Sequence, residues 1–243
     1  MRTLGASHSG RVRSSNQDAY LCGKLAENTA FAVVCDGMGG ANGGNIASSI
    51  AMRSISDKLV DEYRENATPE AIRDLLEEAV LEANGAVFRA AQEEPELYGM
   101  GTTAVAAIAT AEAVYIAYVG DSRAYIITPR EIEQVTKDHS VVQDMVDKGQ
   151  ITPEEAKTHP QKHFLTRALG VEPELECSFT RVAFPDNGTL LICSDGLSNM
   201  VAPEMIESLV RTFAFQDIPM KLITTANLAG GSDNITVVVV TKN

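Results

Sequence analysis

Three apolar, β-branched runs follow one another in the middle of the chain, at Thr103–Ala109, Ala113–Val119 and Arg123–Thr128. Runs of this composition are typical of strands in a sheet interior. Only a turn separates each run from the next, whereas a parallel pair would need a crossover helix between its strands. The runs therefore predict antiparallel strands, and this connectivity limits the folds open to the chain.

Helices and further strands surround these runs in a regular order. Two long segments carry apolar residues at helical spacing, and the second has Thr68 and Pro69 at its N-cap and N1 positions. A second helical pair comes just before the last strand. The predicted helices cover Asn45–Tyr63, Pro69–Gln92, Pro203–Phe213 and Pro219–Leu228, and the other predicted strands cover Ala30–Cys35, Thr189–Cys193 and Ile235–Thr241.

This order of elements predicts an α/β fold of the α+β kind, a four-layer sandwich of two stacked antiparallel β-sheets flanked by pairs of α-helices. The length of 243 residues suits one large domain, and we expect residues 1–243 to form a single domain. The polar, helix-prone stretch Ser140–Arg167 has no strand character. We expect it to run over the surface, where recognition loops are found.

The composition restricts the classes of partner. Hydrophobic residues make up 44% of the chain and charged residues 22%, which is ordinary for a globular protein. The 20 basic and 33 acidic side chains give a formal net charge of -13, which repels phosphate backbones and anionic lipid surfaces. No cluster of Lys or Arg offsets this charge, so we expect no nucleic-acid partner and no membrane partner.

Sequence features also bear on the cellular compartment. The start of the sequence has no apolar stretch that could serve as a signal peptide, and the longest apolar-leaning stretch is interrupted by Thr110 and Glu112. The four cysteines form no CxxC pair, and we expect reduced, buried thiols. These features predict a cytoplasmic protein. No interface signature is apparent, so the oligomeric state is open and a monomer is the expectation.

Four aspartates lie beside small residues at the ends of apolar runs: Asp36 in VVCDGMGG, Asp121 in AYVGDSRAY, Asp195 in LLICSDGL and Asp233 in GGSDNITVVVV. Asp followed by Gly is also an ordinary turn signal, and any one of these residues alone is more simply a turn former. Four converging carboxylates would repel one another and would be costly to bury. Because a divalent cation such as Mg2+ or Mn2+ removes that cost, the repeated pattern indicates a metal centre.

A candidate phosphate-binding group precedes the first of these aspartates. In RVRSSNQD, Arg13 lies just ahead of Asn16, Gln17 and Asp18, and an arginine beside metal ions suits bidentate capture of a phosphate. An exposed arginine in a polar turn is the simpler explanation when the residue is considered by itself. Gly37, which follows Asp36, would let a backbone carbonyl and waters approach the ions closely.

Eight short motifs occur in order between Arg13 and Val240: RSSNQD, CDGMGG, GTTA, VGDSRAY, DHS, LTRALG, CSDGL and GGSDNITVVVV. In this combination the sequence closely resembles the metal-dependent PPM, or PP2C-type, serine/threonine protein phosphatases, and most of all their compact bacterial members. The resemblance implies two antiparallel sheets between helical layers, in agreement with the pattern of elements. It also implies that residues 140–167 form the family's flap subdomain, which is thought to influence substrate choice.

The resemblance assigns metal-binding roles by matched position. Asp36 would bridge two Mn2+ or Mg2+ ions, and the Gly37 carbonyl would complete the shell of one of them. Asp195 and Asp233 would hold the other ion. In bacterial relatives a third, weaker ion is bound, and here Asp121 would hold it together with Asp195.

The remaining implied roles concern the substrate. Arg13 would grip its phosphate, while Asp18 and Asn234 would act through metal-bound waters or supporting hydrogen bonds. A hydroxide bridging two ions would attack the phosphorus in line, without a covalent phosphoenzyme. The expected activity is hydrolysis of phosphoserine and phosphothreonine in proteins, with a serine/threonine kinase and its targets as partners.

One position departs from the family pattern. Relatives often carry a histidine just after DGMGG, a candidate acid for protonating the leaving oxygen, whereas this chain has Ala41. His139, His159 and His163 cluster around the flap, and each is most simply a polar surface histidine. The general acid is therefore left unassigned.

Two other functions stay open at this level. The first is a two-metal phosphodiesterase acting on nucleotides or nucleic acid, which the acidic charge and the missing basic groove oppose. The second is a binding module that keeps the fold and has lost turnover. Ala41 is its only support, and the three aspartates expected to bind metal most directly, Asp36, Asp195 and Asp233, are all present.

Overall fold

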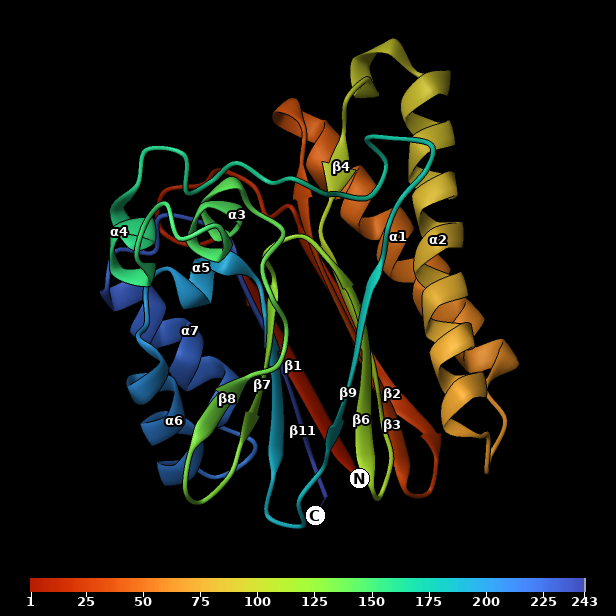
Figure 1. Cartoon of the computed structure of the whole chain (residues 1–243), viewed down its shortest axis with the longest axis vertical. Helices are drawn as coiled ribbons and strands as arrows, with labels where there is room; N and C mark the ends of the chain where they lie inside the picture. Colours follow the sequence, from red (N-terminus) through yellow and green to blue (C-terminus); the bar gives the residue numbers. More distant parts are fainter. Residues whose placement is uncertain (243) are drawn as a thin grey trace.

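The computed structural model describes residues 1–242, apart from the side chains of residues 41 and 42. Two antiparallel sheets lie face to face at its centre (Figure 1). One sheet contains, in spatial order, β1 (Arg2–His8), β11 (Ile235–Thr241), β10 (Thr189–Cys193), β7 (Arg123–Ile127) and β8 (Ile132–Gln134). The other contains β2 (Asp18–Ala26), β3 (Thr29–Met38), β5 (Ala104–Ala109), β6 (Ala113–Val119) and β9 (Ser178–Ala183), with β4 (Gly101–Thr102) beside β3.

Helices cover both outer faces. The pair α1 (Gly40–Glu62) and α2 (Pro69–Glu93), followed by a short turn at Pro95–Leu97, covers the second sheet, and α6 (Pro203–Thr212) and α7 (Ile218–Leu228) cover the first (Figure 1). The short α3 (Val141–Asp147), α4 (Pro153–Thr158) and α5 (Asp195–Ser198) lie near the end of the sandwich opposite the two termini. This arrangement confirms the predicted four-layer α+β sandwich.

The core between the sheets fixes which strand ends meet. Apolar side chains from both inner faces are fully buried there, among them Val34, Val105, Ile116, Ile192 and Val238. Burying a side chain of this size stabilises a fold by roughly 1.5–3 kcal/mol. A one-residue slip would turn these side chains outward, so the packing holds each strand in a single register.

Three parts of the fold differ from the sequence-based prediction. The run at Arg123–Ile127 leaves the meander and joins the other sheet, because Gly120 adopts φ 101° and turns the chain there. The strands β1, β2, β8 and β9 were not among the predicted strands, since each lies at a sheet edge and lacks a continuous apolar run, and the two-residue β4 was also missed. Helix α1 begins at Gly40, whereas the predicted start was Asn45. The prediction missed the first turn because the glycines there have low helix propensity.

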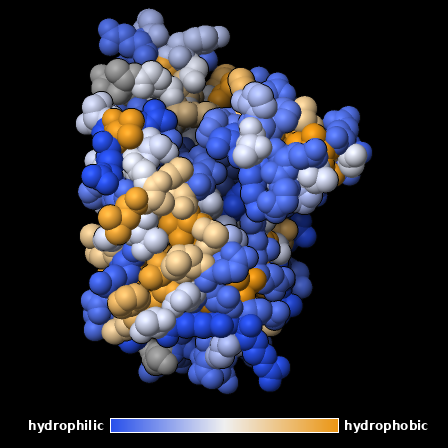
Figure 2. Space-filling view, turned by 90° about the vertical axis from the view of Figure 1, so that its left-hand side faces the viewer, coloured by the Kyte–Doolittle hydropathy of each residue, from blue (hydrophilic) through white to orange (hydrophobic). Residues whose placement is uncertain are grey.

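The surface adds two observations. None of the helices in residues 1–242 has the length and apolarity that a membrane span requires. Figure 2 faces the side that carries α6 and α7 and shows an apolar area there, and Met205, Met220 and Leu228 are the exposed large apolar side chains of these helices. Of the four cysteines, Cys35 and Cys193 are buried as expected, whereas Cys22 and Cys177 are only partly buried.

Candidate functional site

Antiparallel pairing gathers three aspartates at one edge of the first sheet. Strand β10 pairs antiparallel with both β7 and β11, so the end of β10 lies beside the starts of its two neighbours. Asp195 lies just beyond the end of β10, Asp121 lies just before β7, and Asp233 lies just before β11. The topology therefore brings together residues that are far apart in the sequence.

The second sheet contributes two more aspartates at the same end of the sandwich. Asp18 begins β2 and pairs directly with Asp36 in the register of β2 and β3. Strand β3 continues through Asp36 to Met38, two residues beyond the Asp, so this carboxylate projects from a strand and not from a turn. Five aspartates from five segments thus meet where the two sheets end.

A cleft of about 1100 Å³ opens at this end. The predicted site residues that line it are Arg13, Asp36, Gly37, Asp121, Asp195, Asp233 and Asn234. Residues 163–167 of the flap, together with residues 168, 171, 172 and 174–176, form much of the remaining wall. Asp18 is the one predicted residue that does not line the cleft.

The backbone of Asp36 is held on both sides by threonines of the GTTA motif. Its amide donates to Thr103 Oγ1 at 3.0 Å, and its carbonyl accepts from the Thr103 amide and from Thr102 Oγ1, each at 2.9 Å. Thr103 Oγ1 also shares a hydrogen bond with Ser122 Oγ, next to Asp121, at 2.8 Å. The sequence showed the GTTA motif but not this role, which links two of the aspartate-bearing segments.

Asp18 supports the site from behind the cleft. Its Oδ2 accepts from Ser194 Oγ at 2.8 Å, and Ser194 Oγ accepts from the Thr236 amide at 2.9 Å. Its Oδ1 is buried and has no hydrogen-bond partner within residues 1–242. A buried oxygen of this kind requires a cation or a water. The contact with Ser194, which precedes Asp195, was not predicted from the sequence.

The charges of these residues test whether a cation fits. Burial, followed by the charges of Asp18 and Asp195, raises the pKa of Asp36 well above its ordinary value. Burial and the charge of Asp195 raise the pKa of Asp121 to about 7. Burial raises the pKa of Asp18 to about 6. Close carboxylates with raised pKa values are stabilised by a nearby divalent ion, and their oxygen atoms are the ligands that Mg2+ and Mn2+ prefer.

Within the described part of the chain, no group of three His, Cys, Asp or Glu side chains is placed so that it could hold a metal ion as it stands. The donor chemistry and the charge therefore fit divalent ions, while the ligand set assigned from the sequence stays a prediction.

Arg13 lies at the edge of the cleft and contacts one of the aspartates. Its Nη2 donates to Asp233 Oδ2 at 2.8 Å, and the side chain is 55% exposed. The hydrogen bond and charge of Asp233 raise the pKa of Arg13. The guanidinium is thus a permanent cation beside the acidic cluster, within reach of an anion in the cleft.

Asn234 fixes the loop that carries Arg13. Its Oδ1 accepts from the Gln17 amide at 2.8 Å, and its Nδ2 donates to the carbonyls of Ser9 and Ser15 at 3.0 and 2.9 Å. The residue is 5% exposed. The residue therefore acts on the protein backbone, a more specific role than the general one implied by the resemblance.

Replacing Asn234 by alanine is expected to lower the free energy of unfolding by roughly 2–3 kcal/mol, because three backbone groups lose the partner that this buried residue supplies. Chemical denaturation measures this loss. Replacing Asn28, an exposed residue in the turn between β2 and β3, by alanine is the control and should change stability by less than about 0.5 kcal/mol. A loss equal to that of the control would contradict the role of Asn234.

One of the three histidines that were predicted to lie at the surface is buried. His139 is 9% exposed, stacks on Tyr118 with ring centroids 5.3 Å apart, and hydrogen-bonds Ser178 Oγ through Nε2 at 2.9 Å. Its Nδ1 accepts from the Gly120 amide at 3.1 Å, so the ring proton of the neutral form lies on Nε2. His163 is exposed and lines the cleft, and His159 is partly exposed. The side chain at position 41 lies outside the described residues.

His139 is expected to stay neutral throughout the physiological range. Burial, and then the charge of Arg167, lowers the pKa of His139 to about 4, against the opposing charges of Asp138, Glu176 and Asp144. Its stabilising contribution is therefore complete above about pH 6.5 and is lost as the pH falls toward 4. NMR titration of the ring should show no protonation above about pH 5. A midpoint near 6.5 would show that the ring is not buried as described.

Stacked antiparallel sheets that end in an acidic cleft with an arginine at its edge suit the binding of a phosphate ester beside divalent ions. Residues 4–223 match the family model described as Protein phosphatase 2C, and the chain belongs to this family. It is 41% identical over 235 residues to the serine/threonine phosphatase stp of Listeria monocytogenes. The aligned region covers 96% of this chain and 93% of that protein. The expected PPM, or PP2C-type, phosphatase family is thereby confirmed.

Solved structures agree with this family. The serine/threonine phosphatase Stp1 from Staphylococcus aureus matches with a TM-score of 0.92 at 34% identity, over 98% of this chain and 93% of that one. The catalytic domain of the phosphatase PstP, in complex with 2 manganese ions, matches with a TM-score of 0.85 at 34% identity, over 98% and 96% of the two chains. Membership of the family also speaks against the phosphodiesterase alternative.

Proposed function

We propose that this protein hydrolyses phosphoserine and phosphothreonine in other proteins with the help of two or three divalent ions, Mn2+ or Mg2+. The observation that carries the proposal is the meeting of five aspartates from separate segments at one end of the sandwich, where four of them line a cleft together with Arg13. The manganese complex of PstP, a structural neighbour, supports the use of metal ions.

Particular residues would hold the ions. Asp36 and the Gly37 carbonyl would bind at the second sheet, Asp195 and Asp233 at the first, and Asp121 would contribute to a weaker site. When bound, the ions would make water a stronger nucleophile at neutral pH and would neutralise the charge that develops on the phosphoryl oxygens.

The protein groups supply position and charge. Arg13 would bind the phosphate through its guanidinium, whose planar donors match two phosphoryl oxygens. Thr102 and Thr103 keep the Asp36 backbone fixed, which limits the positions open to its carboxylate. The segments that form the outer wall of the cleft, residues 163–168 and residues 171, 172 and 174–176, would contact the substrate chain on either side of the phosphorylated residue.

The biological setting follows from this activity as a further part of the proposal. A serine/threonine kinase and its targets would be the partners, because the phosphatase would reverse the reaction of such a kinase. We propose a monomer acting in the cytoplasm as one domain of residues 1–243, with residues 140–167 as its flap.

Phosphate release from a phosphothreonine peptide in the presence of Mn2+ tests the proposal. We expect release with Mn2+ and none in excess chelator. A phosphodiester such as bis(p-nitrophenyl) phosphate is the matched substrate control and should react much more slowly. Absence of release with Mn2+, or full activity in chelator, would refute the proposed function, and a preference for the diester would favour a phosphodiesterase.

A further inference from the structure

The flap is held to the rest of the molecule by a short stem, which consists of residues 138–140 and 164–166. The Thr166 amide donates to the His139 carbonyl at 2.9 Å, and the Val141 amide donates to the Phe164 carbonyl at 2.9 Å. Ser140 and Leu165 form an antiparallel bridge between these two hydrogen bonds. The two ends of the flap are therefore fixed to each other, and its position depends on where the stem is attached.

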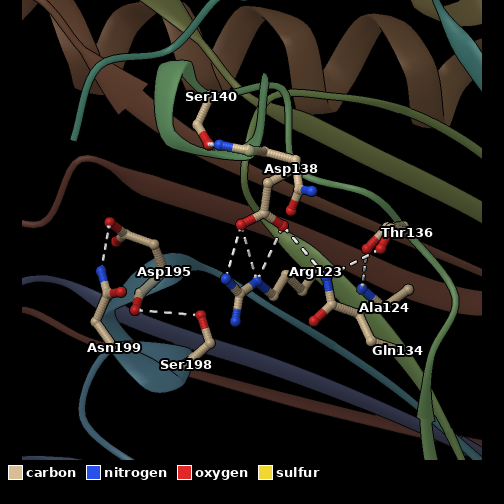
Figure 3. A network of polar contacts seen from close by, with 10 residues as sticks. Arg123, Ala124, Gln134, Thr136, Asp138, Ser140, Asp195, Ser198 and Asn199 are labelled. Atoms are coloured by element: carbon tan, nitrogen blue, oxygen red, sulfur yellow. Dashed lines mark hydrogen bonds and ion pairs between the residues drawn. The ribbon is translucent and has the colours of Figure 1, made fainter. Parts of the chain in front are cut away.

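The stem is attached to the residues on both sides of Asp121. The guanidinium of Arg123 donates to both oxygens of Asp138, with Nε at 3.0 and 3.2 Å and Nη2 at 2.7 Å (Figure 3). The His139 amide donates to the Gly120 carbonyl at 2.9 Å, and the Gly120 amide donates to His139 Nδ1 at 3.1 Å. Gly120 and Arg123 thus connect the Asp121 turn to the stem through five hydrogen bonds.

The chain that leaves the stem continues to the segment that holds the Asp36 backbone. Leu169 exchanges two backbone hydrogen bonds with Thr102, at 2.8 and 3.0 Å, and Thr102 in turn donates to the Asp36 carbonyl. Between these attachments, residues 163–168 line the cleft. A shift of the stem would therefore move a wall of the cleft relative to Asp36 and Asp121.

We propose that Arg123 and Asp138 are positioning residues. Their ion pair holds the flap stem at a fixed position relative to the turn that contains Asp121. The wall of the cleft formed by residues 163–168 is held in place together with the stem. This inference rests on the proposed function for its effect on the reaction, but not for its effect on the stem. The side chains are 27% and 11% exposed, respectively, so the pair is shielded from water far more than an ordinary surface ion pair. Gln134 also donates to Asp138, at 3.3 Å.

The geometry of the pair indicates a positioning role. A planar guanidinium bound to both oxygens of one carboxylate fixes distance and angle together, which a single contact from lysine cannot do. Figure 3 shows Asp195, on α5, on the other side of the Arg123 guanidinium from Ala124 in this view. The neighbouring pair of Lys137 and Asp147 also joins the stem region to α3, but its side chains are 60% and 39% exposed.

Three variants test the proposal. Asp138→Asn removes the charge of the pair, Arg123→Lys keeps the charge and removes the two-point contact, and Lys137→Gln removes the exposed neighbouring pair as a matched control. Arg123→Lys is the variant to use if Asp138→Asn does not fold, as judged by circular dichroism.

Hydrogen exchange without metal or substrate gives the first readout. The amides of Val141 and Thr166 should exchange at least about tenfold faster in Asp138→Asn and Arg123→Lys than in the parent protein, with Val238 in the core unchanged. Lys137→Gln should exchange at the parent rate. Equal stem exchange in all four proteins, or faster exchange at Val238 as well, would overturn the positioning role.

Kinetics at saturating Mn2+ give the second readout. We expect kcat/KM for a phosphothreonine peptide to fall about tenfold or more in the first two variants, and less for p-nitrophenyl phosphate, which is too small to contact the flap wall. Equal losses for both substrates, or none, would overturn the inference that the pair positions this wall. If the parent protein releases no phosphate, the proposed function fails, while the exchange rates still decide whether the pair holds the stem.

Discussion

Replacing Asp36 by asparagine is expected to lower kcat by at least about 1000-fold, because the variant loses a carboxylate that would hold the metal ions. The amide is nearly isosteric with the carboxyl group, and the backbone contacts of Asp36 with Thr102 and Thr103 do not involve its side chain. Phosphate release from the phosphothreonine peptide, measured over a range of Mn2+ concentrations, gives the loss.

The same substitution is expected to preserve or increase stability in the absence of metal. Asp36 faces the like charges of Asp18, Asp195, Asp121 and Asp233, so a neutral side chain removes repulsion from a buried cluster. Thermal unfolding in chelator should therefore give a melting temperature at or above that of the parent. Asp186→Asn, at a 98% exposed carboxylate remote from the cleft, is the control and should retain activity. Activity of Asp36→Asn within tenfold of the parent would contradict the role of Asp36 as a metal ligand.

The expected gain in stability shows that the acidic residues of the site destabilise the fold. Five aspartates at one end of two sheets repel one another, and residues chosen for stability alone would not include them. The apolar core between the sheets offsets this cost, and its side chains lie outside the cleft. Stability and function are thus assigned to different parts of the same strands.

The sequence predicted best the elements that are buried on both faces. The limits of β6, β10 and β11 agree with the prediction, because each is a continuous apolar run flanked by turn residues. The edge strands β1, β2, β8 and β9 were missed because half-exposed strands mix small, polar and apolar residues. The entry of β7 into the other sheet depends on the backbone of Gly120, which no periodicity reveals.

The candidate site shows a similar division. Asp36, Asp121, Asp195 and Asp233 could be identified because each follows or precedes an apolar run, and antiparallel pairing then brings such strand ends together. Side-chain contacts between distant segments could not be predicted, as the burial of His139 shows. Such contacts depend on the packing of the finished fold and leave only single polar residues in the sequence as a signal.

Replacing Arg13 by alanine is expected to lower kcat/KM for the phosphothreonine peptide by about 100-fold, the value of a charged two-point contact with phosphate. Arg13→Lys keeps the charge and should recover part of the loss.

The contact of Arg13 with Asp233 offers a competing explanation, in which the arginine only neutralises that carboxylate. The two explanations differ in their metal dependence. If Arg13 binds phosphate, the alanine variant should lose activity even at saturating Mn2+, and inorganic phosphate should inhibit it more weakly than it inhibits the parent protein. If Arg13 only neutralises Asp233, removing it leaves that carboxylate free for a cation, so saturating Mn2+ should restore the parent activity and phosphate inhibition should be unchanged. That second result would exclude Arg13 as the phosphate-binding residue.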